Sequence, residues 1–372
     1  MSRWFKRSEP AEATSAPLPE PTVPTTRLIH VGPHKTGTTT VQSAFHRNRE
    51  ALAEHGIHYV GPKLQPTDAV KAMTGVGAPA ATRERDKRAW RDMAAKARTI
   101  GLPHIVISSE FLCEADDDVA RQIVEDLGGP TDTRVVVTLR PLAKMVPSQW
   151  QQFVQSSTTL PLEEWTEAVL ARAAEPSTVG LFWRRHRHDD LVRRWASIVG
   201  PENVTVIVCD SRDHDQLTRE FARLLDLPDG LLAPMSQVEN RSLTWEEAEA
   251  IRAFNIEFAE INARRSSEDR RRLALNVDQR LGAWRHVKRR TPSADEHRIP
   301  LPAAAVDRIA ALADEIVENI CASGVRLVGD VEELRAVPPP GPDDAAAPVV
   351  VPAEVAARVA NGLLIQVGRR QD

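Results

Sequence analysis

Short apolar runs alternate with segments of helical periodicity between residues 27 and 209. The runs are mostly continuous rather than alternating in polarity, which is typical of strands that helices cover on both faces. The predicted strands are 27–32, 104–108, 133–140, 203–209 and a weaker one at 57–61. Because strands and helices alternate, we expect an α/β fold in which helices flank a central parallel sheet on both sides.

Helical patterns fill the intervals between these strands and most of the second half of the chain. Val41, Phe45 and Leu52 recur at helical spacing after the first predicted strand, and a similar pattern follows the third. The clearest amphipathic helices of the second half are expected at 244–261 and 303–324. The second half is therefore predicted to be mainly helical.

Both ends of the chain differ in composition from the part between them. Residues 1–26 are rich in Pro, Thr, Ala and Glu, and such a segment buries too little apolar surface to offset the entropy of ordering. We predict a disordered leader at 1–26 and one domain at 27–335. Residues 336–372 are expected to form a linker and a short amphipathic C-terminal helix.

The overall charge argues against some classes of partner. The 372 residues include 48 Lys and Arg against 52 Asp and Glu, a net charge of -4, so no global basic surface points to nucleic acid. Three widely spaced cysteines suggest neither a zinc site nor a disulfide framework. No apolar run reaches about 18 residues and no signal peptide is evident, so we expect a cytoplasmic protein without a membrane span.

The segment HVGPHKTGTTTVQ, residues 30–42, joins a predicted strand to a helix that begins near Thr38. In such a unit the free backbone N–H groups and the helix dipole converge on one point, which attracts an anion. Gly37 permits close backbone approach and Lys35 adds a positive charge. Hydroxyl donors follow in Thr38, Thr39 and Thr40. The segment therefore predicts a site for a phosphate or a sulfate.

The order of residues distinguishes this segment from the usual nucleoside triphosphate loop. That loop reads GxxxxGK[ST], whereas Lys35 here precedes the second glycine of the motif. No predicted strand ends in a carboxylate that would plainly bind magnesium beside it. Because sulfuryl transfer can rely on lysine and amide groups, the sequence favours sulfate over phosphate and predicts no metal ion.

The same segment resembles the 5′-phosphosulfate loop of sulfotransferases that use 3′-phosphoadenosine 5′-phosphosulfate (PAPS), particularly bacterial members. The resemblance extends over residues 27–330 and implies a P-loop-like three-layer α/β fold. It implies that PAPS contacts Lys35, Thr36, Gly37, Thr38, Thr39 and Thr40. Lys35 would then stabilise negative charge on the bridging oxygen of the leaving group.

A second motif follows the third predicted strand. Arg140 stands at the end of that strand, and Ser148 stands eight residues later in the next helix. Alone, they would be an ordinary strand-end arginine and an ordinary helix serine. In the resembling family, an Arg and a Ser in this order bind the 3′-phosphate of PAPS, and a guanidinium suits a phosphate. Together with the loop, Arg140 and Ser148 are predicted to hold that phosphate.

An attacking hydroxyl or amine must lose a proton, so the reaction needs a base near the sulfate. Glu110 follows the second predicted strand, at the edge of the sheet where ligands of open α/β sheets gather. It is our first candidate, although cytosolic members of the family carry a histidine there and a carboxylate can also cap a turn or pair with an arginine. His34, which flanks the loop, is the alternative.

Three further charged features have weaker interpretations. The segment RRHRHDD, residues 184–190, could suggest a metal site but is interpreted as a solvated charged turn. The basic segment 285–290 is interpreted as a solvated face that could also help hold the 3′-phosphate or an acidic acceptor. Arg241 is another candidate for the 3′-phosphate.

These motifs predict a PAPS-dependent sulfotransferase that acts without a metal ion. The acceptor is expected to be a hydroxyl or amine of a carbohydrate, a lipid or a small metabolite, and the motifs define neither it nor the oligomeric state. Two alternatives stay open. One is an ATP-dependent kinase with an atypical loop, and the other is a non-catalytic nucleotide-binding module.

Overall fold

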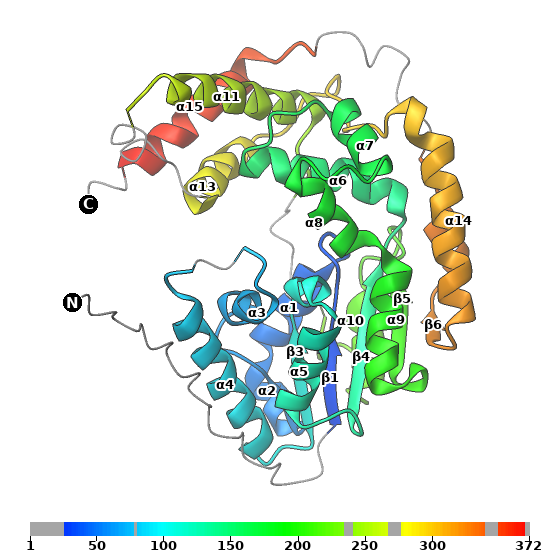
Figure 1. Cartoon of the computed structure of the whole chain (residues 1–372). Helices are drawn as coiled ribbons and strands as arrows, with labels where there is room; N and C mark the ends of the chain where they lie inside the picture. Colours follow the sequence, from blue (N-terminus) through cyan, green and yellow to red (C-terminus); the bar gives the residue numbers. More distant parts are fainter. Residues whose placement is uncertain (1–25, 78–79, 234–240, 267–276, 339–348, 369–372) are drawn as a thin grey trace, which may run out of the picture.

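A computed structural model describes residues 26–77, 80–233, 241–266, 277–338 and 349–368 (Figure 1). The predicted leader lies outside the described residues except for Thr26, which begins the first strand. Most of the predicted linker after residue 336 also lies outside them.

Six parallel strands form one sheet in the order β2-β3-β1-β4-β5-β6. Their bounds are β1 Thr26–His30, β2 Ile57–Tyr59, β3 His104–Ser108, β4 Thr133–Leu139, β5 Val204–Val208 and β6 Arg326–Val328. All five predicted strands are present, and the predicted α/β fold is confirmed. The sixth strand was not predicted, because it has three residues, lies at the edge of the sheet and begins with the exposed Arg326.

Helices cover both faces of this sheet, which explains the continuous apolar runs of its strands. Leu28 and Val136 pack toward one face, while Ile29 and Val137 pack toward the other. The helices on the first face are α1 Thr38–Arg47, α2 Arg49–Glu54 and α10 Gln216–Leu224. Those on the second are α4 Arg83–Thr99, α5 Asp117–Leu127 and α9 His188–Val199. Buried side chains on both faces make the sheet the centre of the core.

The remaining helices gather beyond the carboxyl ends of the strands and along one side of the sheet (Figure 1). They are α3 Thr67–Thr74, α6 Leu142–Ser156, α7 Leu162–Leu170, α8 Ser177–His186, α11 Trp245–Ala263, α13 Val277–Lys288, α14 Val306–Ala322 and α15 Ala353–Gly368. Short 3₁₀ helices are η1 Glu110–Glu114, η2 Pro201–Asn203, η3 Ala303–Ala305 and η4 Val331–Arg335. None of the helices in the described ranges is both long and apolar enough to cross a membrane.

The C-terminal helix α15 packs against α13 and α11 (Figure 1). A Cβ atom at Gly362 would lie 2.5 Å from the carbonyl oxygen of Ala283, so a glycine is needed where α15 crosses α13. Trp284 of α13 is fully buried and donates a hydrogen bond of 2.8 Å from its indole nitrogen to the carbonyl oxygen of Gln155 on α6. α13 is therefore fixed from two sides.

Candidate active site

The loop between β1 and α1 has the backbone of an anion site. Lys35 and Gly37 both adopt positive φ angles, 71° and 85°. No side chain caps α1, so the backbone N–H groups of Thr38 and Thr39 are available to a ligand, whereas that of Thr40 donates to the carbonyl oxygen of Gly37. A Cβ atom on Gly32 would lie 2.2 Å from Cγ2 of Thr38. The loop therefore requires glycine at this position to fold over the start of the helix.

Neighbouring strands hold this loop in place. The buried hydroxyl of Thr36 donates a hydrogen bond of 2.8 Å to the carbonyl oxygen of Pro33 and lies 2.8 Å from Oγ1 of Thr138 on β4. The hydroxyl of Thr36 is thus used inside the fold. At the end of β4, Nη1 of Arg140 donates a hydrogen bond of 3.1 Å to the carbonyl oxygen of Lys35. Arg140 therefore ties the loop to the end of the central strand.

Two lysines, Lys35 of this loop and Lys288, form no ion pair with the described residues. Lys35 is half-buried, and its ammonium forms no ion pair or hydrogen bond with any residue in the described ranges. Burial lowers the pKa of Lys35, and the charge of Glu110 opposes that shift. Lys288, at the end of α13, is also half-buried and unpaired among the described residues. Burial, followed by the positive charges of Lys35 and Arg241, lowers the pKa of Lys288 to about 8.

Because the charge of Lys35 disfavours protonation of Lys288, an anion bound between the two ammonium groups would relieve their repulsion. The sequence did not single out Lys288 from its basic segment. Only the packing of α13 against α6 and α15 distinguishes it from its neighbours.

The two candidate bases lie side by side. Glu110 begins η1, directly beyond β3, and its Oε2 accepts a hydrogen bond of 3.1 Å from the hydroxyl of Thr38. Its Oε1 lies 3.4 Å from Nδ1 of His34. The side chain of Glu110 is 21% exposed, whereas that of His34 is 2% exposed. Of the two groups, Glu110 is therefore the one that an acceptor can reach.

Behind His34 lies a buried ion pair that the sequence analysis missed. Oε1 of Glu114 lies 3.2 Å from Nε2 of His34 and accepts a hydrogen bond of 2.8 Å from Nε of Arg185, whose Nη2 lies 2.6 Å away. Nη1 of Arg185 donates to Oε1 of Gln149 at 3.1 Å. Burial would raise the pKa of Glu114, but His34 and Arg185 outweigh it and hold the pKa below its usual value. Burial lowers the pKa of His34.

The interpretation of 184–190 as a solvated charged turn is wrong. The segment does join two helices, α8 and α9, but Arg185, His186, His188 and Asp189 are buried, with exposures of 6, 0, 2 and 8%. Burial lowers the pKa of His188 to about 4. A signal existed in the sequence, because Arg185 and His186 follow Phe182 at helical spacing and so share its inward face.

The remaining residues predicted to bind PAPS differ in their exposure and in their hydrogen bonds. Thr39 is exposed and Thr40 half-buried in the first turn of α1. Ser148 is half-buried on α6 and forms no hydrogen bond with Arg140. Nε of Arg140 is buried and has no hydrogen-bond partner in the described part of the chain. Arg140 therefore retains a free donor beside the loop that it anchors.

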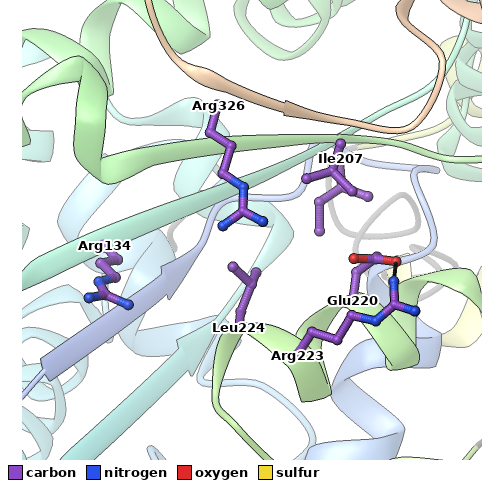
Figure 2. A pocket seen from close by; sticks show the side chains of 7 residues that line it. Arg134, Ile207, Glu220, Arg223, Leu224 and Arg326 are labelled. Atoms are coloured by element: carbon purple, nitrogen blue, oxygen red, sulfur yellow. Dashed lines mark hydrogen bonds and ion pairs between the residues drawn. The ribbon is translucent and has the colours of Figure 1, made fainter.

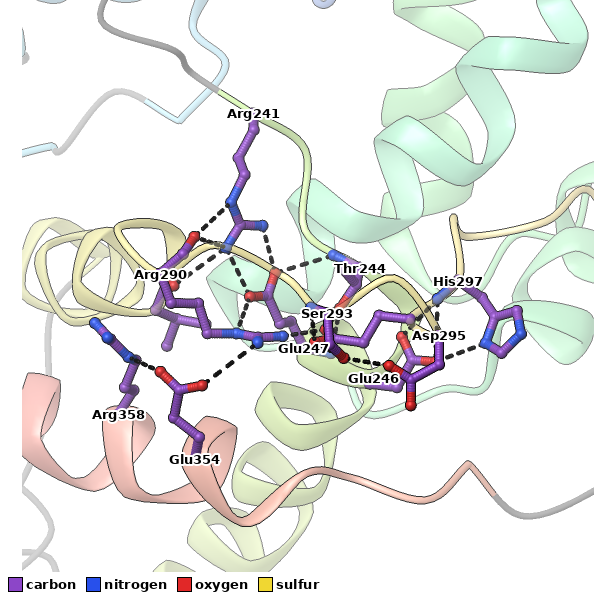
Figure 3. A network of polar contacts seen from close by, with 12 residues as sticks. Arg241, Thr244, Glu246, Glu247, Arg290, Ser293, Asp295, His297, Glu354 and Arg358 are labelled. Atoms are coloured by element: carbon purple, nitrogen blue, oxygen red, sulfur yellow. Dashed lines mark hydrogen bonds and ion pairs between the residues drawn. The ribbon is translucent and has the colours of Figure 1, made fainter.

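Arg241 belongs to a different network, shown in Figure 3. Its guanidinium forms two hydrogen bonds of 2.7 Å with the two carboxylate oxygens of Glu247, which is completely buried. Arg290 donates to the same carboxylate at 2.7 Å and also pairs with Glu296. Glu247 and Thr244 form the capping box that begins α11. We call Arg241, Glu247, Arg290 and Glu296 the α11 network; its arginines are already paired.

A cavity of about 150 Å³ lies beside α10, away from the loop (Figure 2). Arg326 extends from β6 toward Leu224, while Arg223 pairs with Glu220 at 2.6 Å. The lining residues are Arg134, Ile207, Glu220, Arg223, Leu224, Arg326 and Val328. None of the residues predicted for the anion site lines this cavity.

The fold and the site together define a three-layer α/β protein with a glycine-containing loop at the carboxyl edge of its sheet. No family model matches the chain, and no curated protein matches it. Among solved structures, a crystal structure of a sulfotransferase from Alicyclobacillus acidocaldarius is similar, with a TM-score of 0.41 and 18% sequence identity. The match covers 67% of this chain and 100% of that one.

Proposed function

We propose that the protein transfers a sulfuryl group from PAPS to a hydroxyl or amine acceptor without a metal ion. The observation that carries this proposal is the half-buried ammonium of Lys35, which forms no ion pair with the described residues although the charge of the partly exposed Glu110 acts on it. A cation and a carboxylate in this arrangement suit a reaction in which one group receives negative charge and the other receives a proton.

The donor groups of the site fit the two anionic ends of PAPS. The free N–H groups at the start of α1 and the Lys35 ammonium suit the phosphosulfate. Arg140, with its unpartnered Nε, and Ser148 on the following helix suit the 3′-phosphate. PAPS would supply the activated sulfuryl group, and the chain's own residues would bind it and handle the charge and the proton.

In this proposal Glu110 accepts the proton of the attacking hydroxyl or amine. Lys35 stabilises the negative charge that develops on the oxygen bridging the phosphate and the sulfate. Thr38 holds Glu110 by donating a hydrogen bond to its Oε2, which leaves Oε1 to face His34. The acceptor is proposed to be a carbohydrate, a lipid or a small metabolite, and the protein is proposed to work in the cytoplasm.

Isothermal titration calorimetry with adenosine 3′,5′-bisphosphate, the product nucleotide, tests this proposal without knowledge of the acceptor. We expect saturable binding in the absence of magnesium. Absence of binding at millimolar concentration would contradict it. ATP with Mg²⁺ serves as the parallel titration, because preferential binding of ATP with transfer of its phosphate would indicate a kinase instead.

A screen of labelled sulfate transfer from PAPS to pooled sugars, lipids and phenols then tests catalysis. We expect transfer to at least one pool and its loss in Glu110→Gln. A protein that binds the bisphosphate but transfers sulfate to no pool would be a non-catalytic nucleotide-binding module.

A further inference from the structure

We infer that His34 receives from Glu110 the proton that Glu110 takes from the acceptor, and that Glu114 with Arg185 prepares His34 for this role. The inference rests on the proposed function and deepens it, since it gives the base a second group behind it. Glu110 is the catalytic residue that faces the acceptor. His34 and Glu114 act through it and are positioning residues.

The contact between Glu110 and His34 has no hydrogen to share when Glu110 is ionised and Nδ1 of His34 carries no hydrogen. Nδ1 of His34 is buried without a hydrogen-bond partner, although Oε1 of Glu110 lies only 3.4 Å away. An ionised carboxylate has no proton to donate, and a neutral imidazole nitrogen without a hydrogen cannot donate either. Two acceptors that face each other at this distance are mutually unfavourable. A single proton placed on Glu110 converts the contact into a hydrogen bond.

Glu114 determines which nitrogen of His34 carries the hydrogen. Its carboxylate is completely buried, pairs with Arg185 and lies 3.2 Å from Nε2 of His34. Because that carboxylate can only accept, Nε2 must be the donor and the hydrogen of neutral His34 is held there. Nδ1 is consequently left with a free lone pair, directed at Glu110.

The charges around His34 keep it neutral at rest. Glu110 and Glu114 of η1 favour its protonation, while Arg185 and the neighbouring His186 disfavour it. The remaining titratable neighbour, Cys113, is fully buried, and burial raises the pKa of its thiol well above the usual range. Burial of His34 itself outweighs the two carboxylates, and its pKa lies below the usual value. His34 is therefore available to accept a proton rather than already carrying one.

The proton balance of the step is complete. The acceptor oxygen or nitrogen forms a bond to sulfur as the bond between sulfur and the bridging oxygen breaks, and the electron pair of that bond stays with the leaving phosphate. The proton of the acceptor passes to Glu110 and then to Nδ1 of His34. The imidazolium so formed donates from Nε2 to Glu114, whose negative charge stabilises it. When product leaves, the proton returns through Glu110 to solvent.

Burial explains why this path leads through Glu110. The side chains of His34 and Glu114 are 2 and 0% exposed, whereas that of Glu110 is 21% exposed. The ring of Phe111 packs edge-on against His34, with centroids 4.9 Å apart. Water therefore reaches His34 less readily than it reaches Glu110. The proton is removed from the reacting atoms without being released to solvent at once.

Nitrogen NMR of the full chain with labelled histidine tests the resting state without any turnover. The signal of His34 is identified among the 11 histidines by its loss in His34→Gln. We expect His34 to be neutral at pH 7 with its hydrogen on Nε2. In Glu114→Gln we expect a mixture of the two tautomers. The inference would be overturned if His34 of the wild-type protein carried its hydrogen on Nδ1, or if His34 were already doubly protonated at pH 7.

Release of adenosine 3′,5′-bisphosphate from PAPS, with water as the acceptor, tests the working state. We expect kcat to fall roughly 10- to 100-fold in Glu114→Gln and its pH profile to change shape, because His34 loses the group that stabilises its charged form. Glu167→Gln, which removes the same charge from an exposed residue of α7, is the matched control and should leave the rate unchanged. An unchanged kcat and pH profile in Glu114→Gln would contradict the inference.

The two proposals fail in distinguishable ways. If the wild-type protein does not bind the bisphosphate, the proposed function is wrong whatever the NMR spectra show. If Glu114→Gln binds the bisphosphate with wild-type affinity and turns over at the wild-type rate, only the role of His34 and Glu114 is wrong. A merely structural role for Glu114 would weaken bisphosphate binding and thermal stability while leaving the pH profile of the remaining activity unchanged.

Discussion

The two lysines of the candidate site, Lys35 and Lys288, differ from the arginines of the α11 network in their pairing. Arg241 and Arg290 share the buried carboxylate of Glu247, and Arg290 also pairs with Glu296. Lys35 and Lys288 have no carboxylate partner in the described part of the chain. Paired arginines hold helices together, whereas unpaired lysines beside free N–H groups create a place for an anion.

This difference could not be obtained from the number of charges alone. The basic segment 285–290 contributes Arg290 to the α11 network and Lys288 to the loop site. The two residues are only two positions apart, yet Arg290 forms ion pairs and Lys288 forms none with the described residues. A basic cluster in a sequence therefore predicts charge, and packing decides whether that charge is structural or free to bind.

The largest effect is expected when the α11 network loses its shared carboxylate. Glu247→Ala should lower the free energy of unfolding by about 3–5 kcal/mol, because it leaves Arg241 and Arg290 without their buried partner. Chemical denaturation measures this loss. Glu354→Ala, which removes a half-exposed carboxylate 3.8 Å from Arg290, should cost far less. Equal losses in the two variants would contradict the distinction between the regions.

The next largest effect is expected at Lys35, and it should concern turnover rather than folding. Lys35→Ala should reduce bisphosphate release from PAPS roughly 100- to 1,000-fold, the usual cost of removing a group that stabilises transition-state charge. Its stability should not fall, because the wild-type ammonium is half-buried and unpaired. Lys63→Ala, at an exposed lysine, is the control. A wild-type rate in Lys35→Ala would show that the lysine has no role in turnover.

A smaller effect, and one that depends on pH, is expected at Lys288. Its pKa of about 8 means that it is mostly protonated at pH 7 and loses its charge as the pH rises through 8. Bisphosphate affinity of the wild type should therefore fall between pH 7 and pH 9. Lys288→Met should bind about 10-fold more weakly at pH 7, which corresponds to about 1.4 kcal/mol.

The pH series supplies its own control. The bisphosphate affinity of Lys288→Met should stay constant between pH 7 and pH 9, at its lowered level. The affinity of Lys288→Arg, which stays charged, should also stay constant, at the wild-type level. Calorimetry at three pH values measures both. The same decline in all three proteins would show that another group is responsible.

The smallest effect is expected at the cavity beside α10. Arg134 lines that cavity and is exposed, so Arg134→Ala should change bisphosphate affinity less than about twofold. The same calorimetric titration measures this. A large loss of affinity would place the nucleotide in the cavity rather than at the loop.

The sequence predicted the central strands well because their signal is local. The bounds of β3 agree with the predicted 104–108, and the helix after β1 begins at the predicted Thr38. That helix is shorter than its pattern suggested, since it ends at Arg47 and a second helix begins at Arg49. Edge strand β6 was missed because three partly exposed residues leave almost no apolar signal.

The candidate site was predicted only in part, for a related reason. The loop and Glu110 could be found because their position after a strand already places them at the carboxyl edge of the sheet. Glu114 and Arg185 are 71 residues apart in the chain, and nothing local pairs them. Charged residues are almost never fully buried unless paired, so the segment 184–190 was assigned to the surface when its partner was unknown.

The crossing of α13 and α15 at Gly362 also bears on the order in which the site is completed during synthesis. The loop with Lys35 is translated early, whereas α13 is translated long after it and α15 later still. Until α15 has left the ribosome, the apolar side of α13 has only part of its cover. A nascent chain can therefore assemble strands β1 to β5 before α13, β6 and α15 have been made.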